Sequence, residues 1–441
     1  MSFNSPNGIN TLTYSLRTLF AQVCRNWNRI FYSKRVWETF ILHDRTLTRR
    51  KFNYYMGDQY VLDHYRMQLC LHKVSRGFRK IIIKPMENFF NLYEFMMILS
   101  YYCEKFEQLH LIRTLDFTFG CEFAAEKSQN SGVDDKVFGT GGKLLEALKR
   151  LMNDLPGLKH IYLQDLLLEK EEAISLLDDV AYNCCETLKS LRIINCCKDK
   201  YAMLHPAVFI NLQTLTLSTQ HLSEDLLLLL GDIRLENLYL VQTCLTPAVS
   251  PIPTKVWREC HKSSPFLRVH HLLEGPQKSP VVWQEGAAVR SVVFDCPENE
   301  TSIPSIFTAT NLYSNTLEVL AFLGLPQHSL QDNFEDRADT ALMWSSRHCL
   351  YLDTLVVRDI ISTGTVLLIA HQAKNLRRLI VRKRALLRKC EWPYNPEWSD
   401  FFYQWLRKNF DSYERTAEEV TKLLGHKWTA LTDEEFQKFK L

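Results

Sequence analysis

The sequence predicts an α/β solenoid, in which short parallel strands alternate with helices that return the chain to the next strand. Three observations lead to this fold class. One six-residue apolar pattern recurs along the chain, the stretches between its copies have helical periodicity, and 441 residues are too many for one compact core. The composition is otherwise that of an ordinary globular protein, with 46% hydrophobic and 23% charged residues.

The recurring pattern is an apolar residue, two variable residues, an apolar residue, one variable residue and a third apolar residue. Clear copies begin at Leu158, Leu188, Leu212, Leu235, Val289, Leu317, Leu352 and Leu376, and weaker copies lie at 78–83, 112–117 and 266–271. The central residues of successive copies lie 23 to 46 positions apart, which is the spacing of irregular leucine-rich repeats. One unit cannot bury its apolar face alone, so stacked units share a continuous core. The pattern therefore predicts a leucine-rich-repeat solenoid with a parallel sheet on its concave face.

The segments between the copies favour helices. Ala173, Leu176 and Leu177 have helical spacing, and Ser223 is an N-cap candidate directly before an apolar run. A doubly wound α/β fold is the alternative, and it would normally carry a Gly-rich phosphate turn directly after a strand. The glycine cluster at 139–142 follows a polar stretch and is interpreted as a loop.

An amphipathic block precedes the repeats. Its apolar residues recur three or four apart on one helical face and are Leu16, Leu19, Phe20, Val23, Trp27, Ile30 and Phe31. The segment Val23-Cys24-x-x-Trp27, with the pair Val36-Trp37 ten residues beyond the first tryptophan, resembles the second half of an F-box. Followed by leucine-rich repeats, it makes the chain similar to the repeat-containing members of the F-box only family. The alternative is that residues 15–42 form a packed helix pair that caps the solenoid.

The resemblance implies a non-catalytic substrate-recognition subunit of an SCF-type (SKP–cullin–F-box) E3 ubiquitin ligase. In that family the F-box binds the S-phase-kinase-associated adaptor, and through it a cullin and a RING protein, while the repeats hold a protein substrate. The adaptor-binding residues that the resemblance implies here are Leu19, Val23, Cys24, Trp27, Val36 and Trp37. An interaction scaffold without ubiquitin-ligase coupling is the alternative function.

The F-box resemblance is incomplete. A first F-box helix usually has a Leu-Pro pair followed by an acidic residue, whereas residues 4–13 of this sequence are polar. Loss of that helix would remove part of the apolar contact, so we expect the chain as written to bind the adaptor weakly.

The substrate site is expected on the concave face of the sheet. Alternate residues of a strand point to opposite faces, so the variable positions of each pattern point away from the core. The candidate substrate-binding residues at or beside these positions are Lys159, Tyr162, Arg192, Thr214, Thr216, Tyr239 and Arg290.

The composition changes after residue 390. Four of the nine tryptophans lie beyond that point, and three helices are predicted at Trp398–Phe410, Tyr413–Leu424 and Asp433–Phe439. The sequence therefore divides into partial F-box-like helices at 1–45, irregular leucine-rich repeats at 46–390 and an aromatic-rich helical cap at 391–441. Residues 424–435 are also similar to the junction between the second and third helices of HMG boxes, which bind DNA. Seven Lys and Arg against nine Asp and Glu in 395–441 argue against DNA binding there.

Catalytic and metal-binding motifs are not found. The thirteen cysteines include no Cys-x-x-Cys pair, and His270-His271 has no carboxylate at ligand spacing, so neither a metal nor another cofactor is expected. A formal charge of +3 argues against nucleic acid or a membrane as the main partner. Reduced thiols and the lack of a signal peptide favour the cytoplasm or nucleus. A basic cluster could import the chain into the nucleus or bind an acidic partner, or strand alternation could simply send some of its charges to solvent and others to helix ends. It comprises Arg377, Arg378, Arg382, Lys383, Arg384, Arg388 and Lys389.

Overall fold

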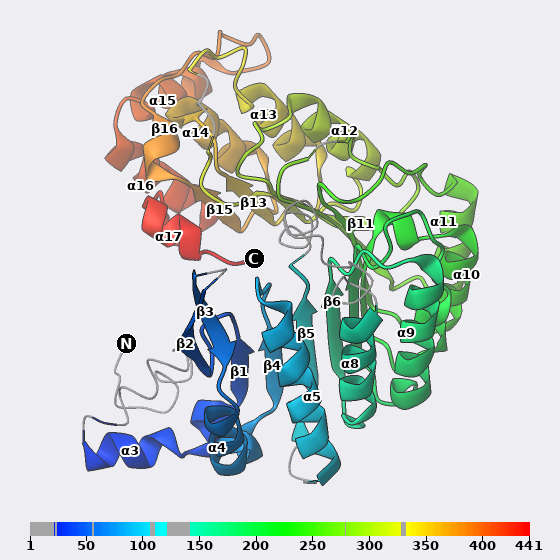
Figure 1. Ribbon diagram of the computed structural model, residues 1–441. Helices are drawn as coiled ribbons and strands as arrows, with labels where there is room; N and C mark the ends of the chain where they lie inside the picture. The colour runs from blue at the N-terminus through cyan, green and yellow to red at the C-terminus, as the bar shows by residue number, and fades with distance from the viewer. Residues whose placement is uncertain are drawn as a thin grey trace. The chain divides into compact units, whose positions relative to one another are not determined.

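A computed structural model describes residues 22, 24–54, 57–105, 111–120, 142–277, 279–327 and 332–441 (Figure 1). The chain folds as two compact units, Met1–Leu235 and Glu236–Leu441. In both units short parallel strands follow one another in chain order, and a helix or a short turn of helix returns the chain between most of them. This arrangement is a leucine-rich-repeat solenoid. A doubly wound fold would reverse its strand order, and the described strands show no reversal.

The first unit contains six parallel strands. They are β1 (Thr39–Leu42), β4 (Lys80–Ile83), β5 (Thr114–Thr118), β6 (His160–Gln164), β7 (Ser190–Ile194) and β8 (Thr214–Ser218). The helices on one side of this sheet are α4 (His64–Val74), α5 (Phe89–Lys105), α8 (Gly142–Asn153), α9 (Lys170–Cys184) and α10 (Glu224–Asp232) (Figure 1). We call the opposite side of each sheet, away from these helices, its open face.

One in-register ladder of apolar side chains holds the first unit together. The residues that lie opposite one another on adjacent strands are Phe40, Ile81, Leu115, Ile161, Leu191 and Leu215. Each of them is at most 2% exposed. The central residues of the predicted patterns therefore lie on adjacent strands and face the helices, as expected.

The second unit repeats the arrangement with six more parallel strands. They are β9 (Asn237–Gln242), β10 (Arg268–Glu274), β11 (Val289–Asp295), β12 (Val319–Phe322), β13 (Thr354–Val357) and β15 (Arg378–Val381). Its helices are α11 (Thr254–Ser263), α12 (Ile303–Tyr313), α13 (Asp339–His348) and α14 (Thr363–Gln372), and β14 (Ile361–Ser362) pairs with β16 (Leu386–Leu387). Val292, Leu320, Leu355 and Leu379 continue the helix-facing ladder.

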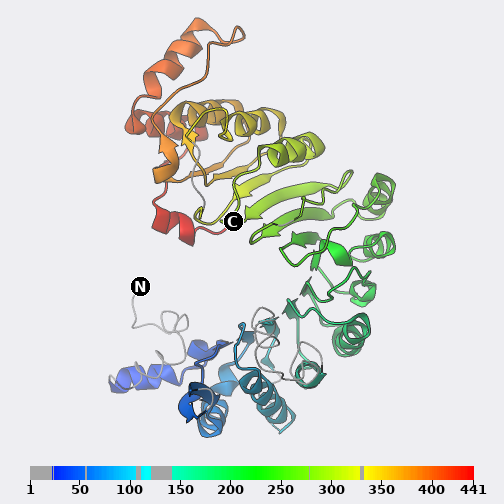
Figure 2. The same cartoon turned by 45° about the horizontal axis from the view of Figure 1, so that its top comes forward.

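The C-terminal helices are α15 (Asp400–Asn409), α16 (Tyr413–Leu424) and α17 (Asp433–Lys438). The three predicted helices are confirmed, to within a few residues at their ends. Ser412 and Thr432 cap α16 and α17 through side-chain oxygens that accept backbone N–H groups, and Gly425 ends α16 with φ of 76°. In the second unit α17 lies on the open face, on the other side of the sheet from α12, α13 and α14 (Figure 2).

The start of the repeat sheet differs from the prediction. Residues 39–42 were assigned to the N-terminal helices, but they form β1, which pairs with β4. Phe40 and Leu42 are buried and alternate with half-buried residues, which is strand periodicity over a stretch too short to distinguish from a helix. The antiparallel hairpin of β2 (Thr48–Asn53) and β3 (Gly57–Leu62) was not predicted. The N-terminal helices that the structure describes are α3 (Arg25–Phe31) and a 3₁₀ turn at Lys34–Trp37.

We expect Leu215→Ala to lower the free energy of unfolding by about 3 kcal/mol, because its fully buried side chain lies in the ladder and its removal leaves a cavity. Leu229→Ala is the matched control, since Leu229 of α10 is 42% exposed. The midpoints of urea unfolding, followed by tryptophan fluorescence, measure both. Equal shifts for the two variants would contradict the ladder as the main source of stability.

Candidate functional site

The open face of the first unit carries a row of adjacent side chains with mixed chemistry. The residues in register across its six strands are Ile41, Ile82, Asp116, Tyr162, Arg192 and Thr216. Strand alternation turns them away from the helices, and Tyr162 and Arg192 are half-buried. The row therefore presents a carboxylate, a phenol ring and a guanidinium side by side.

The polar groups of this row are held by weak, accessible interactions. The Lys80 ammonium lies 3.6 Å from an Asp116 carboxylate oxygen and 5.8 Å from the centre of the Tyr162 ring. Arg192 donates a hydrogen bond to the Gln164 side-chain oxygen at 3.4 Å. An ion pair at the exposure of Lys80 and Asp116 contributes at most about 1 kcal/mol, so a ligand could exchange this pair at little cost.

Five of the predicted substrate-binding residues come together on β6, β7 and β8. Tyr162, Arg192 and Thr214 are half-buried, Thr216 is buried, and Lys159 is exposed directly before β6. The structure adds His160, which the sequence analysis missed, in the row next to Tyr162. Burial and three nearby lysines, with Lys159 the largest contributor among them, lower the pKa of His160. Its position as the first residue of a repeat strand was the available signal.

Tyr239 lies on the open face of the second unit, where it joins a neutral aromatic patch. Its ring stacks on His270 with 4.3 Å between the ring centres. The His270 ring lies within hydrogen-bond distance of Ser291 Oγ, at 2.7 Å, and of Asn237 Oδ1, at 3.3 Å. Burial, helped by Arg268 and Arg290, lowers the pKa of His270 to about 4. The imidazole is therefore neutral at pH 7.

Arg290 is the extra residue of a β-bulge between β10 and β11. Val269 lies opposite Val289 and His270 opposite Ser291, so Arg290 has no opposite residue. Residues three apart in a regular strand point to opposite faces. The bulge removes this difference, so Val289 and Val292 both face the core. The Arg290 guanidinium pairs with Glu318 at 3.0 Å. This residue is half-buried and is held by its pair rather than projecting freely.

A second row on the open face of the second unit is apolar. Its residues in register are Val241, Leu272, Val293, Ala321, Val356 and Ile380. Phe436 of α17 is 3% exposed and packs against Val293, Ala321 and Val356. The sequence predicts a helical cap at 391–441 but not this contact with the open face. Runs such as Leu355-Val356-Val357, with no polar residue between apolar ones, were the signal that these strands are covered on both faces.

The residues assigned to adaptor binding have different environments. Leu19, Val23 and the side chain of Trp27 lie outside the described part of the structure, and Cys24 is exposed directly before α3. Val36 and Trp37 are 0% and 1% exposed. These two residues therefore offer no surface to a partner, and the assignment of an adaptor contact to them is corrected to a role in the core.

Trp37 joins α3 to the repeat sheet. Its indole N–H donates to the Phe31 carbonyl oxygen at 2.6 Å, and its ring lies edge-on to the Phe31 ring at 5.1 Å between ring centres. On the other side it meets Phe78, which precedes β4 and stacks on Phe40. One buried aromatic cluster thus connects the end of the F-box-like segment to β1 and β4, the first two strands of the repeat sheet.

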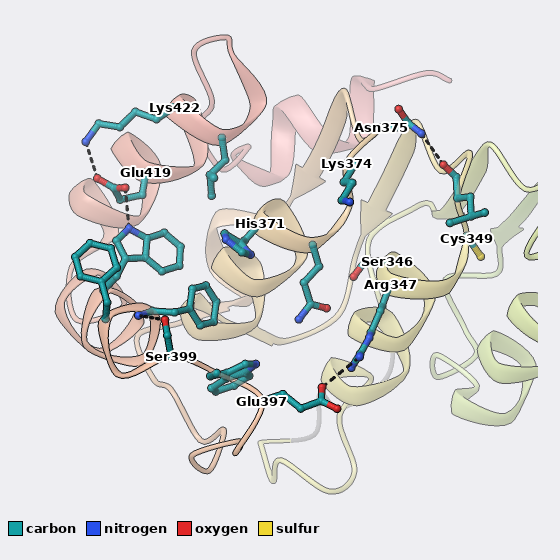
Figure 3. Close-up of a pocket in the computed structure, with 17 residues that line it drawn as sticks. Ser346, Arg347, Cys349, His371, Lys374, Asn375, Glu397, Ser399, Glu419 and Lys422 are labelled. Carbon is teal, nitrogen blue, oxygen red and sulfur yellow. Dashed lines mark hydrogen bonds and ion pairs between the residues drawn. The ribbon is translucent and has the colours of Figure 1, made fainter.

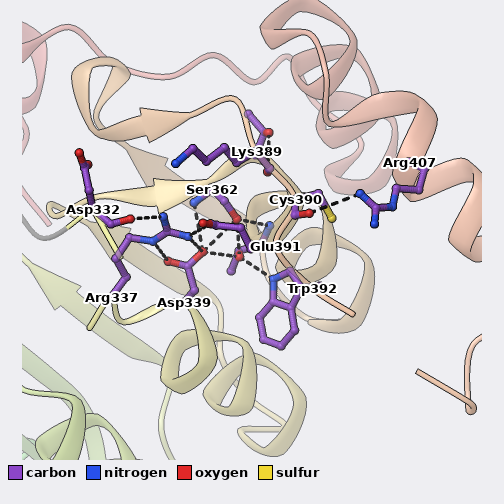
Figure 4. Close-up of polar contacts among 11 residues, drawn as sticks. Asp332, Arg337, Asp339, Ser362, Lys389, Cys390, Glu391, Trp392 and Arg407 are labelled. Atoms are coloured by element: carbon purple, nitrogen blue, oxygen red, sulfur yellow. Dashed lines mark hydrogen bonds and ion pairs between the residues drawn. The ribbon is translucent and has the colours of Figure 1, made fainter. Parts of the chain in front are cut away.

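In the second unit a buried polar network connects α13, β14, α14 and the segment that precedes α15 (Figure 4). Asp339, 0% exposed, accepts hydrogen bonds from Arg337, from Ser362 and from the Thr365 hydroxyl. The Trp392 indole N–H in turn donates to Thr365 Oγ1 at 2.8 Å. Every partner is satisfied within the protein, so this network is structural.

A cavity of about 1050 Å³ lies among α13, α14, α15 and α16 on the helix side of the second unit (Figure 3). Its lining includes two ion pairs, Arg347 with Glu397 at 3.2 Å and Lys422 with Glu419 at 2.6 Å. Burial raises the pKa of the Cys349 thiol to about 11, so this thiol is protonated at pH 7 and a poor nucleophile.

The basic cluster largely pairs with acids or hydrogen-bond acceptors of the same unit. Asp433 forms ion pairs with Arg382, at 3.1 Å, and with Arg384, at 3.3 Å. Arg377 and Arg388 lie near aspartates at longer distances, and Arg378 donates to Thr354. Most of these charges therefore serve the local structure, although the side chains of Arg377, Arg384 and Arg388 remain largely exposed.

Metal and membrane sites are not found in the part of the chain that the structure describes. It contains no group of three His, Cys, Asp or Glu side chains that could hold a metal ion. None of its helices has both the length and the apolar character needed to cross a membrane.

Comparison with known proteins adds little to the fold. No family model and no curated protein matches the chain. A crystal structure of the TLR13–ssRNA13 complex is 10% identical, with a TM-score of 0.28, over 70% of this chain and 46% of its own, so the chain spans less than half of it. The Leptospira interrogans LRR protein LIC12759 is 13% identical, with a TM-score of 0.27, over 92% of this chain and 94% of its own. At such TM-scores the fold assignment rests on this chain's own strand order and register.

The chain is thus a leucine-rich-repeat solenoid protein whose open faces differ: polar and mixed in charge in the first unit, and apolar and partly covered in the second. Solenoids of this class bind partners along such extended faces.

We expect acid to destabilise the second unit through His270. Its pKa of about 4 in the fold lies below the ordinary value of 6.5, so between these pH values the unfolded chain binds the extra proton. The free energy of unfolding therefore falls as the pH falls through this window, by on the order of 1–2 kcal/mol at pH 5. Urea unfolding at pH 7 and pH 5 measures the loss. His270→Asn should reduce it, whereas His261→Asn, at an exposed position of α11, should not; equal losses in all three proteins would contradict the assignment.

Proposed function

We propose that this chain is the substrate-recognition subunit of an SCF-type E3 ubiquitin ligase. The observation that carries the proposal is the F-box-like segment Val23-Cys24-x-x-Trp27, placed directly before a leucine-rich-repeat solenoid. The adaptor binds the N-terminal segment and brings a cullin and a RING protein with it. A protein substrate binds the open face of the first unit.

The connection through Trp37 suits this role. A ubiquitin ligase transfers ubiquitin efficiently when the adaptor and the substrate are held in a defined geometry. A buried aromatic cluster of Phe31, Trp37, Phe78 and Phe40 ties the end of α3 to β1 and β4, which limits independent movement of the two. In this proposal Val36 and Trp37 position the adaptor-binding residues, and Leu19, Val23, Cys24 and Trp27 make the contact.

The row Asp116, Tyr162, Arg192 supports a protein substrate rather than a small molecule. It offers both charge signs and a ring across neighbouring strands. Tyrosine and arginine are the residues that most often dominate binding energy at protein interfaces. The chain itself supplies no chemistry in this proposal, and ubiquitin transfer belongs to the other subunits. The cytoplasm or nucleus is the compartment this role requires.

A scaffold without ubiquitin-ligase coupling is the second candidate. It is favoured by the burial of Val36 and Trp37, which removes two residues from the predicted adaptor contact. Adaptor binding separates the two functions, because only the ligase subunit needs it.

We expect Leu19→Asp with Val23→Asp to weaken binding of the adaptor at least tenfold, because a buried apolar contact would gain two charges. Calorimetric titration of the purified chain with the adaptor measures the dissociation constants. Leu229→Asp, at an exposed position of α10 on the helix side, is the control and should bind like the unaltered chain. Identical constants for all three proteins, or no binding by any, would favour the scaffold.

We expect Lys159→Glu, Tyr162→Ala and Arg192→Glu together to abolish substrate capture without changing adaptor binding. Tyr162 and Arg192 lie on the open face and Lys159 is exposed directly before β6, so the melting temperature should stay within a few degrees. The measurement is the set of proteins that co-purify with the tagged chain and accumulate when cullin activity is blocked. Tyr182→Ala with Arg150→Ala on the helix side is the matched control. Unchanged capture by the triple variant would place the substrate elsewhere.

A further inference from the structure

The short helix α17 covers the apolar row of the second unit's open face. Phe436 packs against Val293, Ala321 and Val356, which belong to three adjacent strands. Partly buried apolar side chains surround this contact: Leu272, Val319, Leu323, Leu325, Ile380, Leu431 and Phe439. The helix α17 therefore covers the middle of the second unit's open face.

Closing the end of the sheet does not require α17. The residues before it already line the last strand, where the Leu431 N–H donates to the Val381 carbonyl at 2.9 Å and the Lys383 N–H to the Leu431 carbonyl at 2.7 Å. The Trp428 indole N–H donates to the Leu379 carbonyl at 2.6 Å. These bonds satisfy the edge of β15. Phe436 reaches beyond that edge to β13, β12 and β11, so its role differs from that of an edge cap.

Two kinds of contact hold α17 in place. Phe436 supplies an aromatic anchor, and Asp433 supplies a carboxylate that pairs with Arg382 and Arg384. A capping box between Thr432 and Glu435 organises the first turn. Six residues are too few to form a stable helix alone, so the helix depends on the face that it covers. The contacts of α17 therefore show that the open face of the second unit binds an aromatic side chain together with a nearby carboxylate.

We propose that this apolar row is a docking groove for a short amphipathic helix of a partner protein, and that α17 is a built-in occupant which the partner displaces. The partner helix resembles Leu431–Phe439: an apolar residue, an acidic residue two positions later, and aromatic residues three and six positions after the acid. The acid binds Arg382 and Arg384, and the first aromatic residue takes the place of Phe436 on Val293, Ala321 and Val356.

The partner helix can displace α17 because it makes the same kinds of contact. Each contact of the partner replaces an equivalent contact of α17, so the apolar row remains covered from water. Only molecules with an uncovered groove can bind the partner, so the apparent affinity equals the intrinsic affinity multiplied by the uncovered fraction. The inference does not depend on the adaptor or on ubiquitin, and it concerns a different face from the proposed substrate row of the first unit.

The test uses a chain that ends at Ala430 and a fluorescent peptide of residues 431–441. The shortened chain keeps the Trp428 hydrogen bond to β15, and the peptide brings back the two Leu431 hydrogen bonds, which Phe436→Ala in the peptide leaves intact. Fluorescence anisotropy should show that the shortened chain binds the peptide at least tenfold more tightly than the full chain does. Phe436→Ala in the peptide should abolish binding, whereas Gln437→Ala, at an exposed position, should leave it unchanged. Equal binding by both chains, or equal binding of both variant peptides, would overturn the proposal.

A second variant keeps the test decisive if the shortened chain does not fold. Full-length Phe436→Ala retains the edge bonds and should bind the unaltered peptide at least tenfold more tightly than the full chain, with circular dichroism confirming the fold. No peptide binding by this folded variant would show that α17 is structural only. A full chain that dimerises, and becomes monomeric when residues 431–441 are removed, would identify a second copy as the occupant and overturn the partner assignment.

Discussion

The rest of the structure depends on one constraint: each repeat must place its central apolar side chain opposite that of the next repeat. Ile161, Leu191 and Leu215 lie in register and are fully buried, so the backbone hydrogen bonds of the sheet and the apolar contacts of the core specify the same alignment. A slip of one residue would turn every such side chain to the open face. Where the register does shift, at Arg290, a bulge restores the alignment and Val292 returns to the ladder.

Because the ladder uses only one side of each strand, the other side is left to function. In the first unit that side carries Asp116, Tyr162 and Arg192, and the partly exposed ion pair of Asp116 with Lys80 contributes little to stability. In the second unit the corresponding residues include Val293 and Val356, which cannot remain exposed without cost. The same architecture therefore produces one face that stays open and one that needs a cover.

The strands and the C-terminal helices could be predicted because their signals are local. The pattern around Leu215, or the N-cap at Thr432, lies within a few residues of the element that it defines. The position of α17 could not be predicted, because Phe436 meets Val293 and Ala321 from a distant part of the chain and no local pattern records that contact. The same reason applies to Val36 and Trp37: their motif is local, whereas their burial depends on Phe78 and on the sheet. Of the proposed substrate row, alternation identified Tyr162 and Arg192, but only pairing across strands brought in Asp116 and Lys80.

The basic cluster connects these arguments. Taken as a string of charges, Arg382 and Arg384 suggest a signal for nuclear import or an acidic partner, yet both pair with Asp433. Arg382 is almost fully buried, and its guanidinium also donates to the Arg358 carbonyl at 3.0 Å, so its position is held even when Asp433 leaves. A buried cation without its carboxylate is unfavourable, which gives the uncovered groove a preference for an acidic replacement. The acidic partner that the sequence suggested and the internal Asp433 then bind the same two arginines, Arg382 and Arg384, in turn.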